Sequence, residues 1–297
     1  MTHQLRGVLT ALSTPFDRDE AIDVATLRRV VDRSIHAGVD GVVAAGSTGE
    51  VGALSSDERM LLVDTVVEHT AGRVPVIAQT GATTTAEAIR LSRAAQRSGA
   101  DVLMLLTPYY EPLSVAETVA YVKDVAAAVD LPVMLYNIPA VTGVNLDHET
   151  VRSLATEVDN IRYIKDSSAD WEQALRLIHH HRDVIGTFIG WDAYLYSALV
   201  EGAAGVMAGA ANVVPDEIVR VARLIGEGDL TGALALWKRL YPVIDQLLGV
   251  PFIPAVKAGL TLQGVPAGAP RRPTAPLTAE QVDALRPVLS SLVPEVV

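Results

Sequence analysis

Lys165 is the residue of this sequence best placed for covalent chemistry. It closes the short apolar run 161–165, and a polar Asp-Ser-Ser segment then interrupts the strand pattern. A lysine at the carboxyl end of a buried strand can be desolvated until its amine is partly neutral, and a neutral amine attacks ketones. Side chains alternate along a strand, so we expect Lys165 to share the inward face with Ile161 and Tyr163. The pattern predicts Schiff-base chemistry; the alternative is a lysine that reaches solvent or pairs with Asp166.

Tyr136 is the second candidate for a chemical role. It closes the apolar run 131–136, one predicted strand before Lys165, and residues 137–143 form the loop that follows. Adjacent parallel strands lie roughly 5 Å apart, so a tyrosine and a lysine at equivalent heights can meet over the end of a sheet. A phenol in that position can transfer protons during imine and C–C bond chemistry. The alternative is a tyrosine that only packs its ring.

The third candidate is the loop that directly follows the predicted second strand. Its residues are Gly46, Ser47, Thr48, Gly49 and Glu50. Glycines that permit a tight turn, two hydroxyls and free backbone N–H groups make a receptor for a carboxylate or a small phosphate. No lysine follows the last glycine, and the spacing does not match the dinucleotide fingerprint. We therefore expect a small-anion site and no nucleotide cofactor.

Other polar motifs carry weaker signals. His179, His180 and His181 follow one another late in a predicted helix, where exposed histidines complement the helix dipole, so we expect them on the surface. The sequence has neither an HExxH pattern nor a carboxylate cluster, so no metal site and no cofactor are predicted. No serine has a Gly-x-Ser-x-Gly setting. Tyr109 and Tyr110, after the fourth predicted strand, could pack at a rim or an interface.

The elements that must position these residues recur as short apolar runs with helical spacers. Repeated strand–helix units indicate a parallel sheet, and runs that are apolar throughout indicate burial on both faces. The units continue to eight without a switch point, which favours a (β/α)8 TIM barrel over a doubly wound sheet. The predicted strands are 7–12, 41–45, 75–79, 102–106, 133–136, 161–165, 187–189 and 205–208.

After Pro215 the pattern becomes helical, which predicts a C-terminal helical extension. The predicted helices cover 217–225, 230–248, 254–262 and 279–292, with a Pro/Gly-rich stretch at 264–276. We expect a barrel domain of residues 1–225 and an extension of residues 226–297. In a barrel of this kind the active site lies at the carboxyl ends of the strands, where the three candidates fall.

Composition bounds the class of protein. The chain has 297 residues, 49% of them hydrophobic and 20% charged, which is enough for a large buried core. The net charge of −11, with both signs interspersed, argues against nucleic-acid or membrane partners. No cysteine is present, so no disulfide or thiolate metal site forms. The first six residues lack an apolar signal core and no run is long enough to span a bilayer, so we expect a cytoplasmic protein.

Four motifs together resemble the dihydrodipicolinate synthase / N-acetylneuraminate lyase family. The resemblance runs from about residue 7 to residue 212, and four motifs in order are far more specific than any one. They are Gly-Ser-Thr-Gly-Glu at 46–50, Thr-Pro-Tyr-Tyr at 107–110, Tyr-Asn-Ile-Pro at 136–139 and Ile-Lys-Asp at 164–166.

The resemblance implies a class I aldolase or lyase that uses pyruvate or another 2-oxo acid. Lys165 would condense with the ketone and Tyr136 would transfer protons. Ser47 would link Tyr136 to Tyr110 of a neighbouring subunit, so the family's usual homotetramer, built from dimers, is expected. Thr48 and the adjacent backbone amides would hold the 2-oxo acid carboxylate.

The chain departs from both activities that give the family its names. Synthases usually carry an arginine two residues after the proline of the Tyr-Asn-x-Pro loop, where this sequence has Val141. Lyases of the family resemble this sequence at Gly-Trp-Asp 190–192. Where they usually have a glutamate next this sequence has Ala193, and where they have a serine that binds the sugar it has Gly209. Fewer polar groups favour a shorter or less hydroxylated acceptor, because an unpaired buried hydroxyl costs about 1–3 kcal/mol. The candidate substrate-binding residues are Gly46, Thr48, Gly190, Asp192 and Gly209.

These observations favour a Schiff-base aldolase acting on a 2-keto-3-deoxy sugar acid. The alternatives within the same chemistry are a dihydrodipicolinate synthase that binds its semialdehyde with another cation, and a 2-keto-3-deoxy acid dehydratase. A non-catalytic sugar-acid sensor on the same scaffold is the alternative from another class, because a fold does not fix a function. The presence of both Lys165 and Tyr136 speaks against a sensor.

Overall fold

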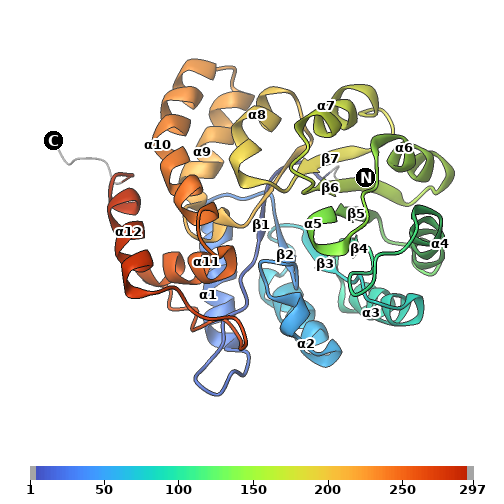
Figure 1. Cartoon of the computed structure of the whole chain (residues 1–297), viewed down its shortest axis with the longest axis horizontal. Coiled ribbons are helices and arrows are strands. Elements are labelled where there is room, and N and C mark those ends of the chain that lie inside the picture. The colour runs from blue at the N-terminus through green and yellow to red at the C-terminus, as the bar shows by residue number, and fades with distance from the viewer. Residues whose placement is uncertain (1–4, 293–297) are drawn as a thin grey trace.

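The chain folds into a closed barrel of eight parallel strands. The computed structural model describes residues 5–292. Each strand pairs with its neighbours in the sequence, and β1 pairs with β8 to close the ring (Figure 1). The strands are β1 (Gly7–Ala11), β2 (Gly41–Ala44), β3 (Val76–Gln79), β4 (Val102–Leu106), β5 (Val133–Asn137), β6 (Ile161–Asp166), β7 (Gly186–Ile189) and β8 (Gly205–Ala208). The predicted (β/α)8 barrel is confirmed, with strand ends shifted by at most one residue.

Helices connect the strands and surround the barrel (Figure 1). Several begin with side-chain caps: Ser55, Ser114 and Thr278 each form a reciprocal capping box with the residue three positions later. The helices of the barrel are α1 (Val24–His36), α2 (Ser56–Thr70), α3 (Thr85–Ser98), α4 (Val115–Ala126), α5 (Pro139–Thr142), α6 (His148–Glu157), α7 (Trp171–His180), α8 (Leu195–Val200) and α9 (Pro215–Gly226). Single 3-10 turns are η1 (Val51–Ala53), η2 (Asp192–Tyr194) and η3 (Ala210–Asn212).

Three further helices follow the barrel on the side of α1 and α9 (Figure 1). They are α10 (Leu230–Leu248), α11 (Phe252–Leu262) and α12 (Ala279–Ser290), so the predicted C-terminal helices are confirmed. α10 packs against α9, and α11 packs against η3 at the carboxyl end of β8. The boundary between residues 225 and 226 stays a prediction. No helix within residues 5–292 combines the length and the apolarity that crossing a membrane requires.

The core has two layers, one inside the barrel and one between the strands and the helices. Leu9, Met104, Tyr136 and Phe188 are among the interior side chains, and each is at most 2% exposed. Their neighbours along the strands point outward and pack under the helices, as the two-residue period of a strand requires.

The prediction for the inward face of β6 is wrong for Ile161. Tyr163 lies inside the barrel, but Ile161 packs in the outer layer. The pairing of β5 with β6 shifts register between Val133 and Met134, so Met134 pairs with Tyr163 instead of Arg162. A bulge of this kind adds one residue to a strand and reverses the alternation on one side of it. Tyr163 and Lys165, both beyond the bulge, keep the expected spacing.

Candidate active site

Lys165 and Tyr136 lie side by side at the carboxyl ends of β6 and β5. The two residues are direct partners in the strand register, as their predicted heights imply. The Lys165 Nζ atom lies 4.1 Å from the centre of the Tyr136 ring, and the lysine is 4% exposed. The protonated amine is attracted by the electron density of the ring face, which holds the end of the side chain over Tyr136. The alternative pairing with Asp166 is not formed, because Asp166 accepts hydrogen bonds from Asn137 and Ser168.

Tyr136 is joined through its hydroxyl to the loop after β2. The Tyr136 hydroxyl and the Ser47 Oγ atom are 3.1 Å apart, within hydrogen-bond distance, and either can donate. The tyrosine is 2% exposed, so its phenol has few solvent partners and Ser47 fixes its direction. This arrangement can pass a proton between a substrate near Lys165 and the β2 loop.

Gly190 gives Lys165 the space that it occupies. A Cβ atom added at Gly190 would lie 2.5 Å from Lys165 Cε and closer still to the Ser167 hydroxyl. Carbon atoms in contact normally lie about 3.5–4.0 Å apart, so any side chain here would displace the lysine. The structure therefore places Gly190 against the Lys165 side chain.

Asp192, Gly209 and Thr48 come together from three different loops. The Asp192 carboxylate accepts hydrogen bonds from the backbone N–H groups of Gly209 at 3.3 Å and Ala210 at 2.8 Å. A Cβ atom at Gly209 would lie 3.1 Å from the Thr48 hydroxyl and nearer to the Phe252 ring. Asp192 thus ties the loop after β7 to the turn after β8, and Gly209 in that turn lies beside Thr48 of the β2 loop. Burial raises the pKa of Asp192 to about 6, against the opposing effects of those two N–H groups and the positive charge of Lys165.

An ion pair beneath the β2 loop was not anticipated from the sequence. Glu50 ends the motif in a left-handed backbone conformation, and its carboxylate lies 2.8 Å from the Lys257 amine on α11. Both side chains are at most 3% exposed. Lys257 also donates to the Ala269 carbonyl at 3.1 Å and lies over the Phe16 ring, and burial lowers its pKa. The C-terminal helices therefore hold the loop that carries Ser47 and Thr48. The only hint of this ion pair in the sequence is the single lysine of α11, a segment with no other charged residue.

A polar network supports the strand ends from the outside. The Asn137 amide donates to Asp166 and to Asn145, both at 2.9 Å, and Gln173 on α7 also donates to Asp166. Burial raises the pKa of Asp166, although the hydrogen bonds from Asn137 and Ser168 oppose the shift. These contacts tie the residues that follow Tyr136 and Lys165 to each other, and the Tyr-Asn and Lys-Asp pairs were their only sequence signal.

Gly46 belongs to this cluster, whereas Tyr110 lies apart from it. Gly46 directly precedes Ser47, and a Cβ atom added there would contact Met104. Tyr110 is 84% exposed in the single chain. His179 and His180 are exposed, as expected, but the expectation is wrong for His181. That residue is 5% exposed, and its ring stacks on that of His148.

The comparison with known proteins agrees with this geometry. The family model described as "Dihydrodipicolinate synthetase family" matches residues 4–292. The 4-hydroxy-tetrahydrodipicolinate synthase of Oceanobacillus iheyensis is 38% identical over 283 residues, which cover 95% of this chain and 96% of the relative. The same-named enzyme of Pelobacter propionicus is 40% identical over 272 residues, covering 92% and 93%.

A solved structure shares the whole architecture. The crystal structure of dihydrodipicolinate synthase from Acinetobacter baumannii, complexed with pyruvate, superposes with a TM-score of 0.93 at 31% identity. The superposition covers 97% of this chain and 99% of that one. A family model over nearly the full length and relatives above 30% identity give the same assignment. The chain therefore belongs to the dihydrodipicolinate synthetase family and is a lyase of the Schiff-base aldolase class.

Proposed function

We propose that Lys165 forms an imine with pyruvate and that the resulting enamine joins an aldehyde. The observation that carries this proposal is the position of the buried Lys165 amine, 4.1 Å above the ring of Tyr136, whose hydroxyl lies 3.1 Å from Ser47. A carbonyl carbon bound at the amine lies beside a phenol that can exchange protons with it. Thr48 and the backbone N–H groups of its loop take the pyruvate carboxylate.

The steps follow from these positions. The neutral amine adds to C2 of pyruvate, and loss of water gives the imine. Removal of a C3 proton gives the enamine, whose C3 attacks the aldehyde carbon while the aldehyde oxygen gains a proton. Tyr136 takes and returns these protons, with Ser47 holding the phenol in place. Release of the lysine by water, or by an amine of the second substrate, regenerates the free enzyme.

Aspartate 4-semialdehyde is the acceptor that we propose, as in a 4-hydroxy-tetrahydrodipicolinate synthase. Relatives of that name are 38–40% identical over more than nine-tenths of this chain. This support favours the synthase over the sugar-acid aldolase that the sequence motifs put first.

A 2-keto-3-deoxy sugar acid is the second candidate substrate, and Val141 is the observation that favours it. Val141 is 55% exposed on the short helix α5 after β5, at the position where the family's synthases usually carry an arginine for the second carboxylate. A dehydratase that uses the same imine would lose water from such an acid without breaking its carbon chain.

Trapping with borohydride tests the imine. Incubation with pyruvate and borohydride, followed by peptide mass mapping, is expected to give a reduced adduct on Lys165. Lys165→Arg is the matched control, because it keeps the positive charge but cannot form an imine. An adduct on another lysine, or none, would refute the mechanism.

The acceptor is decided by a comparison of products. We expect pyruvate and L-aspartate 4-semialdehyde to condense, with the cyclic product detected by coupling to its reductase. Pyruvate release from a panel of 2-keto-3-deoxy sugar acids, without condensation, would instead identify the second candidate. Water loss with the carbon chain intact would identify a dehydratase.

We also propose that Tyr110 completes the proton relay of a neighbouring subunit within a homotetramer. Its 84% exposure in the single chain leaves it free to enter a partner's site. Mixing inactive Lys165→Ala and Tyr110→Phe proteins, followed by subunit exchange, tests this, because a mixed dimer contains one site with both native residues. Recovery of activity supports the relay in trans, whereas full activity of Tyr110→Phe alone would contradict it.

A further inference from the structure

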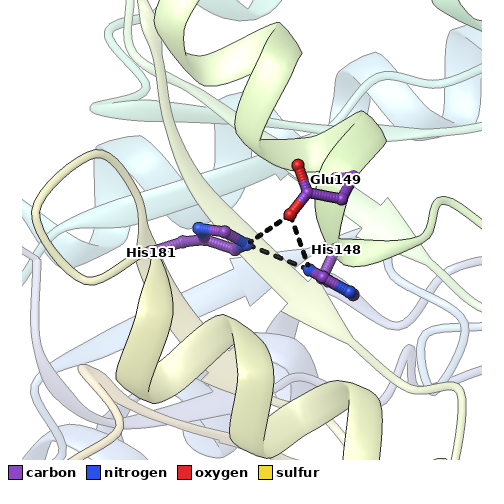
Figure 2. Close-up of side chains that lie close together, drawn as sticks. All are labelled: His148, Glu149 and His181. Atoms are coloured by element: carbon purple, nitrogen blue, oxygen red, sulfur yellow. Dashed lines mark hydrogen bonds and ion pairs between the residues drawn. The ribbon is translucent and has the colours of Figure 1, made fainter.

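We propose that His148, Glu149 and His181 form a binding site for one Zn²⁺ ion that links α6 to the end of α7. His148 and Glu149 are the first two residues of α6, and His181 is the residue that ends α7. Each offers one ligand atom, and the three atoms lie within 4.8 Å of one another. Figure 2 shows the three side chains converging from the two elements. This site is separate from the residues proposed for catalysis.

The distances between the ligand atoms suit a tetrahedral ion. His148 Nδ1 lies 3.1 Å from His181 Nε2, and Glu149 Oε1 lies 3.4 Å from the first nitrogen and 3.9 Å from the second. Zn²⁺ binds these atoms at about 2.0–2.2 Å, so tetrahedral ligands of one ion lie about 3.3–3.5 Å apart. Shifts of a few tenths of an ångström would bring all three atoms to that spacing.

A hydrogen bond between the two imidazoles is the competing explanation for this geometry. One shared proton can join the two ring nitrogens, but it does not account for a carboxylate oxygen directed at both of them (Figure 2). A cation at the centre interacts favourably with all three. Two imidazoles and one carboxylate are a common ligand set for Zn²⁺, with water in the fourth position.

Neighbouring groups restrict the positions of the ligands. His181 is 5% exposed, so packing holds its side chain in place. Arg152 holds the other oxygen of Glu149 with an Nε–Oε2 distance of 2.8 Å and so orients the carboxylate. Arg176 lies 3.4 Å from His148 Nε2 and is also paired with Glu172. Metal binding through Nδ1 puts the proton on Nε2, so Arg176 must give up its contact with that nitrogen.

An ion here would connect two helices of the barrel. α6 precedes β6 and α7 follows it, so the ion would join the two helices on either side of the strand that carries Lys165. Glu149 is 56% exposed, which leaves the fourth position open to water. Binding to the folded chain alone would raise its stability in proportion to the logarithm of the Zn²⁺ concentration.

A zinc titration of the full chain without a polyhistidine tag tests the site. After removal of metal with EDTA, ZnCl₂ is added in competition with a chromophoric chelator, and the unfolding temperature is measured with and without zinc. We expect one tightly bound ion per chain and a higher unfolding temperature. His148→Gln and His181→Gln should each weaken binding by at least about tenfold, the least that even an outer partner of a metal site contributes.

His179 and His180 provide the matched control, because they belong to the same histidine run but lie outside the site. The double variant His179→Gln, His180→Gln should keep both the bound ion and its thermal effect. Loss of the ion in this control, equal affinity in His148→Gln, or no binding at micromolar zinc would overturn the proposal. Circular dichroism establishes that each variant is folded, and X-ray absorption of the loaded protein should report two imidazole ligands.

Discussion

Replacing Gly190 with alanine should disable Lys165 while leaving the fold in place. The added Cβ atom would lie 2.5 Å from Lys165 Cε, about 1 Å inside the normal carbon–carbon contact distance. The side chain must therefore move by about 1 Å, and misplacing a reacting group by that much can lower the rate about 100-fold. Overpacking of this kind also costs about 1–3 kcal/mol of stability, less than a folded domain normally has.

The assay is the rate of borohydride-trapped adduct formation at saturating pyruvate, measured by mass spectrometry. Gly190→Ala should form the adduct about 100-fold more slowly than the native chain. Gly52→Ala is the matched control, because no atom lies within 4 Å of a Cβ atom added there, and it should react at the native rate.

Adding Ser167→Ala to the variant separates the two contacts that the new Cβ atom makes. It removes the contact with the Ser167 hydroxyl but leaves the one with Lys165, so the double variant should stay slow. Native adduct rates in a folded Gly190→Ala protein would refute the placement of the amine against Gly190.

Tyr136→Phe keeps the ring under the Lys165 amine but loses the hydroxyl, so kcat should fall about 10²–10⁴-fold. The urea midpoint of unfolding should change little. Ser47→Ala should lower kcat in the same way but by less. Lys257→Met leaves the buried Glu50 carboxylate without its ionic partner, with only the Arg271 backbone N–H donating to it, and should lower the free energy of unfolding by about 3–5 kcal/mol in urea titrations. Adding Glu50→Gln should recover much of this loss, and a Lys257→Met protein as stable as the native chain would contradict the pairing. Burial raises the pKa of Asp192 from 3.8 to about 6, so the folded state holds this proton more tightly than the unfolded state does, and the group's contribution to stability is present below pH 4 and lost as the pH rises to about 6. Asp192→Asn should therefore flatten the dependence of the unfolding midpoint on pH between 4 and 6, and an unchanged slope would show that this carboxyl is not the group responsible.

The barrel and the neighbouring positions of Lys165 and Tyr136 were predictable because both depend on local patterns. Apolar runs of four to six residues with helical spacers indicate parallel strands. Parallel strands in succession place Tyr136 and Lys165 at the same end and in neighbouring positions, and the observed register pairs them. The loop that carries Ser47 was likewise recognisable from its glycines and hydroxyls.

The supporting contacts were not predictable because they join segments far apart in the chain. Nothing near Glu50 in the sequence points to Lys257, and the shared burial of the two charges exists only when α11 packs at the barrel mouth. The bulge in β6 depends on the register with β5, which strand periodicity does not specify.

The sequence by itself therefore determined the fold class and the neighbouring positions of the Lys165 amine and the Tyr136 phenol, because side-chain period and strand order are properties of local sequence. Only the tertiary structure decided which polar groups meet across the fold. His181 illustrates the difference. It follows two exposed histidines, and the sequence predicts that it is exposed too, but it lies buried against His148. Burial and pairing depend on how distant elements pack, and no local pattern records that packing.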